Sequence, residues 1–238
     1  MNIFSIEQNL IHIDDHVIVI NKPAGLRVIP DGYDPTLPNL RDMLNAIYPK
    51  IWVVHRLDKD TSGILLFARD AATHSALNRQ FEKRTIQKEY SLIVMGTPDW
   101  QTITINLPLR TNGDRKHRTI IDFSKGKPAE TVFTVKERFP QHTLLIASPH
   151  SGYTHQIRAH ISAAGFPIYG DMLYWQPAAH LSKLKFHTHT PACPAYINRV
   201  ALHAVQIAFF DSYANTSRTF IAESPPDFLK CLDNIRIL

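Results

Sequence analysis

The sequence contains few cysteines and no long apolar stretch, and each shortage excludes a class of protein. Cys193 and Cys231 are its only cysteines, so neither a disulfide framework nor a four-cysteine zinc site can form. The longest apolar run, residues 64–68, is far shorter than the roughly 20 residues of a membrane-spanning helix. Residues 1–7 also lack the basic region and apolar core that begin a signal peptide. We therefore expect a cytoplasmic protein with no membrane segment.

The composition shows no excess that would indicate disorder, a repeat or a linker. Hydrophobic residues make up 44% and charged residues 20% of the 238-residue chain, as in ordinary globular proteins. This length suits one domain, so we expect a single domain over residues 1–238. The formal net charge of +5 permits an acidic partner such as RNA, although many mildly basic proteins bind no nucleic acid.

Short apolar runs separated by polar breaks indicate that strands dominate the chain. We expect residues 11–20 to form two short strands that turn at residues 14–16, and residues 63–68 to form a buried strand. Further strands are expected at about 88–95, 101–107, 118–123, 130–137, 142–148 and 201–210. Many sequential strands with a few inserted helices predict an α+β fold with a largely antiparallel mixed central sheet and a few flanking helices.

Helices are expected at points where apolar residues follow helical spacing. One such pattern begins at Leu40 and stops at Pro49. Asp70 is placed to cap a helix that runs to about residue 84. Thr154 is placed to cap a helix that stops at Gly165, and a last short helix should follow residues 225–226.

A polar loop at residues 55–63 feeds directly into the buried strand. It carries an arginine, a lysine, two aspartates and two hydroxyls, and such a loop is a rigid place to hold a reactive side chain. From the residues alone, Asp58 could be a nucleophile, a general base or a salt-bridge partner of Arg56 or Lys59. Residues 61–63, Thr-Ser-Gly, could equally be turn residues whose hydroxyls cap backbone groups.

The stretch HRLDKDTSGILLFA, residues 55–68, resembles the signature loop of the RluA-type RNA pseudouridine synthases. The related RsuA-type branch usually begins this motif with glycine, so His55 favours the RluA type. Other segments resemble family motifs in the expected order: NKPAGL at 21–26, KEY at 88–90, GYTHQIRAH at 152–160, PIYGD at 167–171 and LHA at 202–204. The resemblance spans about residues 10–212 and implies the pseudouridine synthase catalytic fold.

The resemblance implies an isomerase that breaks the C1′–N1 bond of a uridine, rotates the base and rejoins it through C5 without a cofactor. Asp58 would be the catalytic carboxylate, whether it attacks the sugar, attacks the base or abstracts a ribose proton. Arg158 would stabilise the ionised form of Asp58, with an exposed helix cation as the alternative. Tyr90 would stack on the uracil or accept a proton, with a core tyrosine as the alternative.

Substrate-binding residues follow from the same resemblance. Arg56 would fill the stack left by the flipped nucleotide. Ile157 would form an apolar floor under the base, with a core isoleucine as a nearly equal alternative. Thr61 and His55 belong to the same loop, and for His55 we expect a structural role, bonded to backbone. A departure lies at Tyr153, where the family usually has arginine, which puts substrate binding in doubt more than chemistry.

Two basic stretches, residues 79–88 and 110–127, are suited to RNA phosphates. We expect Lys83 from the first and Lys116 from the second to bind the substrate. We expect an rRNA or tRNA substrate, no S4 domain before the catalytic domain, no protein partner and a monomer.

Three alternatives compete with this function. His187, His189 and Cys193 could be imagined as metal ligands, but no fourth ligand is evident and we expect no metal. A catalytically silent RNA-binding protein would not need the reactive residues named above. A glycoside hydrolase using Asp58 and Asp60 would require carboxylates that face each other across a sugar, which so short a spacing does not provide.

Overall fold

The computed structural model describes residues 5–175 and 196–237 of the chain. Two compact units are present, the first formed by residues 1–88 and 203–225 and the second by residues 89–202 and 226–238. The single domain expected from the sequence stays a prediction.

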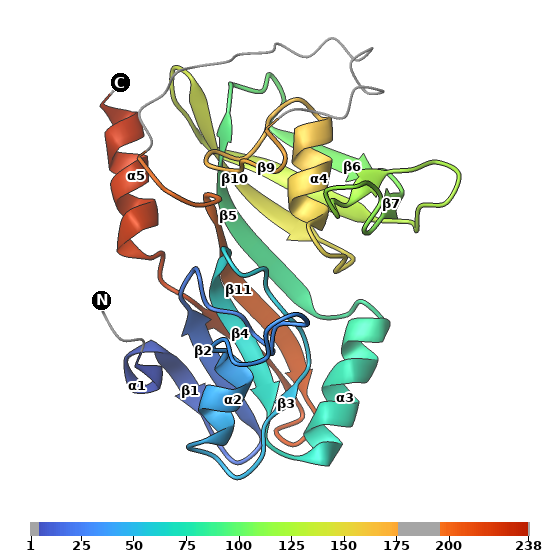
Figure 1. The fold of residues 1–238 in the computed structure, drawn as a ribbon, viewed down its shortest axis with the longest axis vertical. Coiled ribbons are helices and arrows are strands. Elements are labelled where there is room, and N and C mark those ends of the chain that lie inside the picture. The colour runs from blue at the N-terminus through green and yellow to red at the C-terminus, as the bar shows by residue number, and fades with distance from the viewer. Residues whose placement is uncertain (1–4, 176–195, 238) are drawn as a thin grey trace. The chain divides into compact units, whose positions relative to one another are not determined.

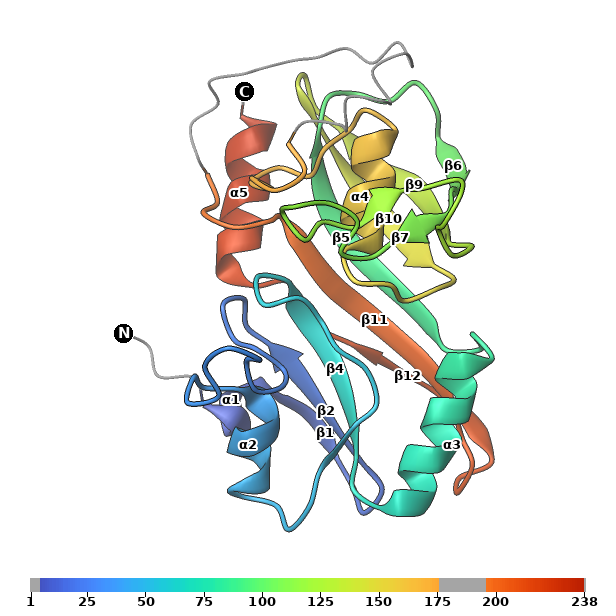
Figure 2. The same cartoon turned by 45° about the vertical axis from the view of Figure 1, so that its right-hand side comes forward.

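The sheet of the first unit is built from strands that are far apart in the sequence (Figures 1 and 2). Its neighbouring strands, in spatial order, are β1 (Leu10–Ile13), β2 (Val17–Lys22), β4 (Ser62–Ala68), β11 (Leu202–Asp211) and β12 (Thr216–Ile221). The β4–β11 pair is parallel and the other pairs are antiparallel. The short β3 (Trp52–Val53) pairs antiparallel with β4. Every residue of β4 is buried, as expected for a continuous apolar strand inside a sheet.

The helices of the first unit are α1 (Ile6–Asn9), α2 (Leu40–Asn45) and α3 (Ala71–Glu82). Asp70 caps α3 as predicted, because its side chain accepts a hydrogen bond from the backbone N–H of Thr73 at 2.8 Å. Leu40 and Leu44 of α2 are fully buried in a core shared with β2 and β4. The helix ends before Pro49, at Asn45, whose side chain accepts a hydrogen bond from the backbone N–H of Ile51.

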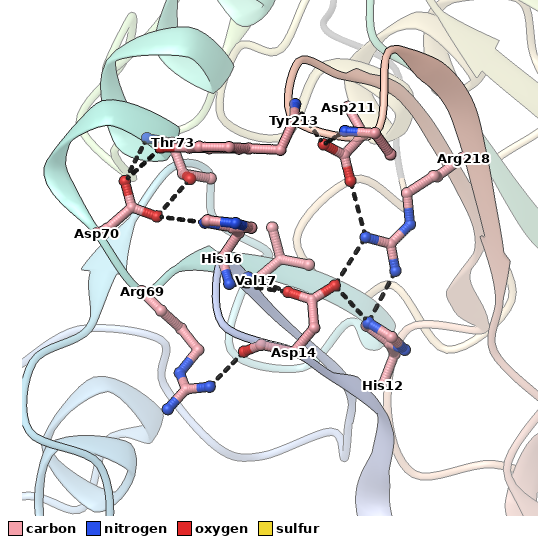
Figure 3. Close-up of polar contacts among 11 residues, drawn as sticks. His12, Asp14, His16, Val17, Arg69, Asp70, Thr73, Asp211, Tyr213 and Arg218 are labelled. Carbon is pink, nitrogen blue, oxygen red and sulfur yellow. Dashed lines mark hydrogen bonds and ion pairs between the residues drawn. The ribbon is translucent and has the colours of Figure 1, made fainter.

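A polar network joins the β1–β2 turn, the start of α3 and the β11–β12 hairpin (Figure 3). Arg218 of β12 donates to Asp14 in the turn at 2.8 Å. His16 Nδ1 lies 3.0 Å from a carboxylate oxygen of Asp70, and the ring of His16 stacks on that of Tyr213 with centroids 3.6 Å apart. These contacts fix the loops at one end of the first unit.

The second unit contains a four-stranded antiparallel sheet in the order β5 (Gln87–Met95), β10 (His142–Pro149), β9 (Glu130–Arg138) and β6 (Thr102–Asn106). Buried and less buried residues alternate along β9, with Thr131, Phe133 and Val135 buried. The alternation indicates that one face of this sheet covers the core of the unit.

The remaining elements of the second unit are the short strands β7 (Leu109–Arg110) and β8 (Ile120–Ile121), with helices α4 (Gln156–Ala163) and α5 (Pro226–Arg236). Both views place α4 along β9 and β10 (Figures 1 and 2). The α+β class and the largely antiparallel mixed pairing are therefore confirmed.

The predicted start of α4 is wrong. His155, not Thr154, precedes the first helical residue, and it adopts the left-handed conformation with φ 56° and makes no capping bond. The carbonyl of Thr154 instead accepts a hydrogen bond from Thr119 Oγ1 at 2.6 Å, which binds this residue to the β7–β8 hairpin. The predicted stop is correct, because Gly165 has φ 90° and follows the last turn.

Candidate active site

The side chain of Lys22 holds the backbone of the loop that carries Asp58. Lys22 is fully buried at the end of β2, and its Nζ donates to the carbonyls of Pro23 at 2.8 Å, Leu26 at 2.9 Å and Lys59 at 3.1 Å. The backbone N–H of Gly25 donates to the same Lys59 carbonyl at 2.8 Å. A buried ammonium needs such partners to offset its loss of hydration. The NKPAGL segment therefore fixes the backbone next to Asp58, a role that the sequence did not reveal.

Asp58 and Thr61 form the turn of this loop. Asp58 is half-buried, and its carbonyl accepts a hydrogen bond from the backbone N–H of Thr61 at 3.2 Å. Thr61 Oγ1 is buried and has no hydrogen-bond partner among the residues that the structure describes. An unsatisfied buried hydroxyl costs about 1–3 kcal/mol. Thr61 therefore keeps an unused hydrogen-bonding group three residues from Asp58, although this group is closed to solvent.

Ser62 and Gly63 join the loop to β11. Ser62 Oγ lies 3.0 Å from His203 Nδ1, and His203 Nε2 lies 3.2 Å from the carbonyl of Ala222. Because a carbonyl can only accept, Nε2 carries the proton and Nδ1 accepts from the serine. Gly63 has φ 117°, and a Cβ there would overlap the backbone oxygen of Ala204. The TSG and LHA motifs therefore build one close strand contact.

His55 and Arg56 differ in exposure although they are neighbours. The backbone N–H of Leu66 donates to His55 Nε2 at 3.0 Å, and the imidazole stacks on Phe81 with centroids 5.0 Å apart. Burial, together with the charge of Lys88, lowers the pKa of His55 to about 3. His55 is thus a neutral acceptor bonded to backbone, while Arg56 is exposed and available to a ligand.

Arg158 is held in the second unit by a buried carboxylate. Its Nε and one terminal nitrogen each donate to Asp171 at 2.7 Å, and its guanidinium carbon lies 4.9 Å from the ring centroid of Tyr174. Asp171 is 1% exposed and also accepts from the backbone N–H groups of Leu173 and Tyr174. Bidentate pairing of this kind fixes the plane of a guanidinium. The sequence matched Asp171 to the PIYGD motif without giving it this role.

Gln156 and His160, also on α4, bind the helix to β9. The amide of Gln156 donates to the carbonyl of Glu130 at 2.9 Å and to Thr131 Oγ1 at 3.0 Å. His160 Nδ1 lies 3.0 Å from Thr131 Oγ1, and Nε2 lies 3.0 Å from the carbonyl of Leu107. Burial lowers the pKa of His160 to about 4, so its imidazole is neutral at pH 7. The THQIRAH motif therefore contains both Arg158 and the two residues, Gln156 and His160, that attach α4 to β9.

Tyr90 and Ile157 both contact the core of the second unit. Tyr90 lies on β5 opposite Ala147 and is half-buried against that core. Ile157 is a buried member of the same core. Their proposed contacts with a uracil stay predictions. Tyr153 is half-buried, packs against the neighbouring cluster around Leu109 and donates its backbone N–H to Gln156.

Each of the two basic stretches has an exposed lysine. Lys83 is exposed at the end of α3, whereas Lys88 is half-buried, and burial lowers the pKa of Lys88 to about 8. Lys116 is exposed in the β7–β8 hairpin.

The described residues offer no group of three or more histidine, cysteine, aspartate or glutamate side chains that could hold a metal ion. His187, His189 and Cys193 lie outside the described residues. Within residues 5–175 and 196–237, every helix is too short or too polar to cross a bilayer.

Comparison with known proteins identifies a family that this chain matches. Residues 16–163 match the sequence profile of the family described as RNA pseudouridylate synthase. The dual-specificity RNA pseudouridine synthase RluA of Pasteurella multocida (strain Pm70) is 35% identical over 225 residues, covering 92% of this chain and 94% of that protein. The ribosomal large subunit pseudouridine synthase C of Haemophilus ducreyi is 36% identical over 226 residues, covering 93% and 67%.

Solved structures show the same fold. Human RNA pseudouridylate synthase domain containing 1 superimposes with a TM-score of 0.74 at 25% identity, over 97% of this chain and 90% of that one. Human RNA pseudouridylate synthase domain containing 4 gives the same TM-score and identity, over 97% of this chain and 94% of that one.

Proposed function

Because this chain belongs to the RNA pseudouridylate synthase family, we propose that it isomerises specific uridines of structured rRNA or tRNA to pseudouridine, with Asp58 as the catalytic carboxylate. The observation that carries the proposal is the loop of residues 55–63, in which every signature position is present and held in place. Lys22 fixes the carbonyl next to Asp58, and Ser62 and Gly63 fix the loop against β11. A backbone fixed on both sides of a carboxylate suits a group that must meet a reacting atom precisely.

The target uridine must leave its stack before a carboxylate can reach C1′. Arg56 is exposed beside Asp58 and would occupy the space of the flipped nucleotide. Thr61 would contact the bound nucleotide only after its buried Oγ1 becomes accessible. Asp58 would then support cleavage of the C1′–N1 bond, rotation of the uracil and rejoining through C5. C5 loses a proton and N1 gains one, so the product is an isomer and no cofactor is required.

Arg158 and Tyr90 are the other two residues that we propose to take part in the reaction. Arg158 would stabilise the ionised carboxylate of Asp58, and Asp171 would orient its guanidinium for that purpose. Tyr90 would stack on the uracil and accept the C5 proton, while Ile157 would contact the opposite side of the base. Lys83 and Lys116 would bind phosphates.

Two relatives support the substrate class. One is named a dual-specificity RNA pseudouridine synthase and the other a pseudouridine synthase of the large ribosomal subunit. From these names we infer an rRNA or tRNA substrate for this chain. We also propose a cytoplasmic location and a monomeric protein that acts without a protein partner.

Asp58→Asn tests the proposal, and Asp60→Asn is its matched control. Total RNA from a strain that lacks the protein would be incubated with each variant and its pseudouridines mapped. Asp58→Asn should abolish product, because an amide cannot supply the charged carboxylate, and should change RNA affinity by only a few fold. Asp60→Asn should retain turnover, which would also contradict a glycosidase that uses both aspartates.

Mass spectrometry must confirm that the Asp58→Asn preparation carries the intact amide and has not deamidated. Substantial turnover in such a preparation would exclude Asp58 as the catalytic carboxylate. Absence of new pseudouridine with the wild-type protein would instead indicate an RNA-binding protein without activity.

A further inference from the structure

We propose that residues 107–129, here called the basic hairpin, form an RNA-docking arm in which Phe123 stacks on an unpaired base. The proposal rests on the proposed function, because it takes structured RNA as the ligand. The hairpin contains β7 and β8 and two turns, at residues 111–118 and 122–127. No motif of the signature loop or of α4 includes Phe123.

Phe123 is 75% exposed, although a phenylalanine is usually found inside a protein. A single exposed apolar residue is common and by itself indicates no ligand. The backbone beneath it and the charges along the hairpin distinguish this one.

The turn that carries Phe123 is rigid. Asp122 Oδ1 accepts from the backbone N–H groups of Ser124 and Lys125, each at 3.0 Å. The N–H of Gly126 donates to the Asp122 carbonyl at 2.8 Å, and a Cβ at Gly126 would overlap that carbonyl. A ring presented on a fixed backbone loses little conformational freedom when a base stacks on it.

The charges of the hairpin are arranged so that only positive ones remain available. Its two acids are each engaged by an arginine: Arg118 contacts Asp114 and Arg110 contacts Asp122, both at 2.7 Å. Its other cations are exposed and form no ion pair among the described residues: Arg115, Lys116, Lys125 and Lys127. An aromatic ring among unpaired cations matches an unpaired base with its flanking phosphates.

The basic hairpin is also attached to the segment that carries Arg158. Thr119 Oγ1 donates to the carbonyl of Thr154 at 2.6 Å, just before α4. The Thr119 N–H donates to the hydroxyl of Tyr174 at 2.7 Å, and the ring of Tyr174 faces Arg158. RNA held by the hairpin would therefore be held in a fixed register with Arg158.

The test compares binding of two fluorescein-labelled RNAs, a stem–loop with a randomised unpaired loop and a blunt duplex of the same stem. Phe123→Leu should weaken stem–loop binding roughly 5- to 100-fold, because it removes the stacking ring. It should leave duplex binding and the salt dependence unchanged, because the charge of the hairpin stays the same. Phe123→Tyr retains the ring and should bind the stem–loop like the wild type.

Tyr33→Leu is the matched control, because Tyr33 is 97% exposed on a similar turn whose charged residues, Asp31 and Asp34, are acidic and would repel phosphates. Replacing Lys125 and Lys127 together by glutamine should weaken binding of both RNAs. The plot of log affinity against log salt should flatten by about 0.7–0.9 for each phosphate that the variant no longer binds.

Equal stem–loop affinity for Phe123→Leu and the wild type would overturn the stacking role, as would an equal weakening by Tyr33→Leu. An unchanged salt slope in the double lysine variant would overturn the binding of phosphates by these lysines. Pseudouridine mapping keeps the two proposals distinguishable. If the wild type forms pseudouridine but Phe123→Leu binds normally, only the docking arm fails. If binding changes as expected but the wild type forms no pseudouridine, only the proposed reaction fails.

Discussion

At the scale of single residues, two buried charged side chains fix the positions of groups in the candidate site. Lys22 places its ammonium on three backbone carbonyls, and Asp171 places its carboxylate on Arg158 and two backbone N–H groups. Burying a charge is costly unless its hydrogen bonds are replaced, and both residues meet that condition. Neither is expected to react. Lys22 instead fixes the backbone next to Asp58, and Asp171 fixes the guanidinium of Arg158.

Asp171→Asn tests whether Asp171 positions Arg158. The variant keeps the shape of the side chain but removes the charge that pairs with the guanidinium. We expect kcat to fall on the order of 100-fold, because the guanidinium loses its fixed orientation, with KM for RNA nearly unchanged. Stability should fall by about 3 kcal/mol, because the variant breaks an ion pair whose carboxylate is fully buried. Single-turnover rates and urea unfolding would measure the two effects.

Asp227→Asn provides the control for Asp171→Asn. Arg199 and Asp227 form a similar bidentate pair in the same unit, with distances of 2.6 and 3.0 Å, but the Asp227 side chain is 48% exposed. Arg199 also donates to the carbonyls of Val200 and Leu202, so loss of the half-exposed Asp227 charge should cost about 1 kcal/mol or less and leave kcat unchanged. If both variants lowered kcat equally, the effect would be one of general stability, and Asp171 would have no positioning role.

At the scale of secondary-structure elements, the close approach of β4 and β11 holds the signature loop. The parallel pairing sets Ser62 opposite His203 and Gly63 opposite Ala204. Only glycine fits at position 63, both because φ is 117° and because Ala204 occupies the space of a Cβ. The position of the catalytic loop therefore depends on a strand contributed by the C-terminal part of the chain.

Gly63→Ala should destabilise the protein by about 3 kcal/mol or more, because backbone strain and steric overlap add. Gly25→Ala separates the two contributions. Gly25 also has a positive φ, of 85°, but nothing lies within 4 Å of a Cβ there. That control should cost only about 1 kcal/mol, the strain alone. Urea unfolding of both variants would measure the difference, and equal destabilisation would mean that Ala204 can move aside.

At the scale of the whole molecule, stability should depend on pH through histidines buried in both units. His55 in the first unit has a pKa of about 3 and His160 in the second a pKa of about 4, both lowered chiefly by burial. Well above pH 6.5 each is neutral in the folded and the unfolded chain and adds no pH dependence. As pH falls below 6.5, the unfolded chain binds protons that the folded chain does not, so the free energy of unfolding decreases.

His160→Gln should flatten this dependence between pH 6.5 and 4. The difference between the ordinary pKa of 6.5 and about 4 corresponds to a decrease in stability of roughly 3 kcal/mol over that interval. Glutamine can replace both hydrogen bonds of His160 but cannot titrate. Urea unfolding at several pH values would measure the slope. A slope for His160→Gln equal to that of the wild type would refute the assignment.

The sequence by itself determined the α+β class, the strands with an apolar pattern, the Asp70 cap and the loop that carries Asp58. These depend on local periodicity and on short motifs, which are properties of neighbouring residues. It did not indicate β12, because that edge strand buries none of its residues and so has no apolar pattern.

Only the tertiary structure decided which side chains hold the site. The partner of Lys59 is Lys22, that of Ser62 is His203 and that of Arg158 is Asp171. Likewise, Thr154 bonds to Thr119 instead of capping α4, and the acids of the basic hairpin pair with two of its arginines. Such contacts follow from how strands and loops pack in space. A hydrogen bond depends on distance and direction between groups, and neither is encoded in the spacing of residues along the chain.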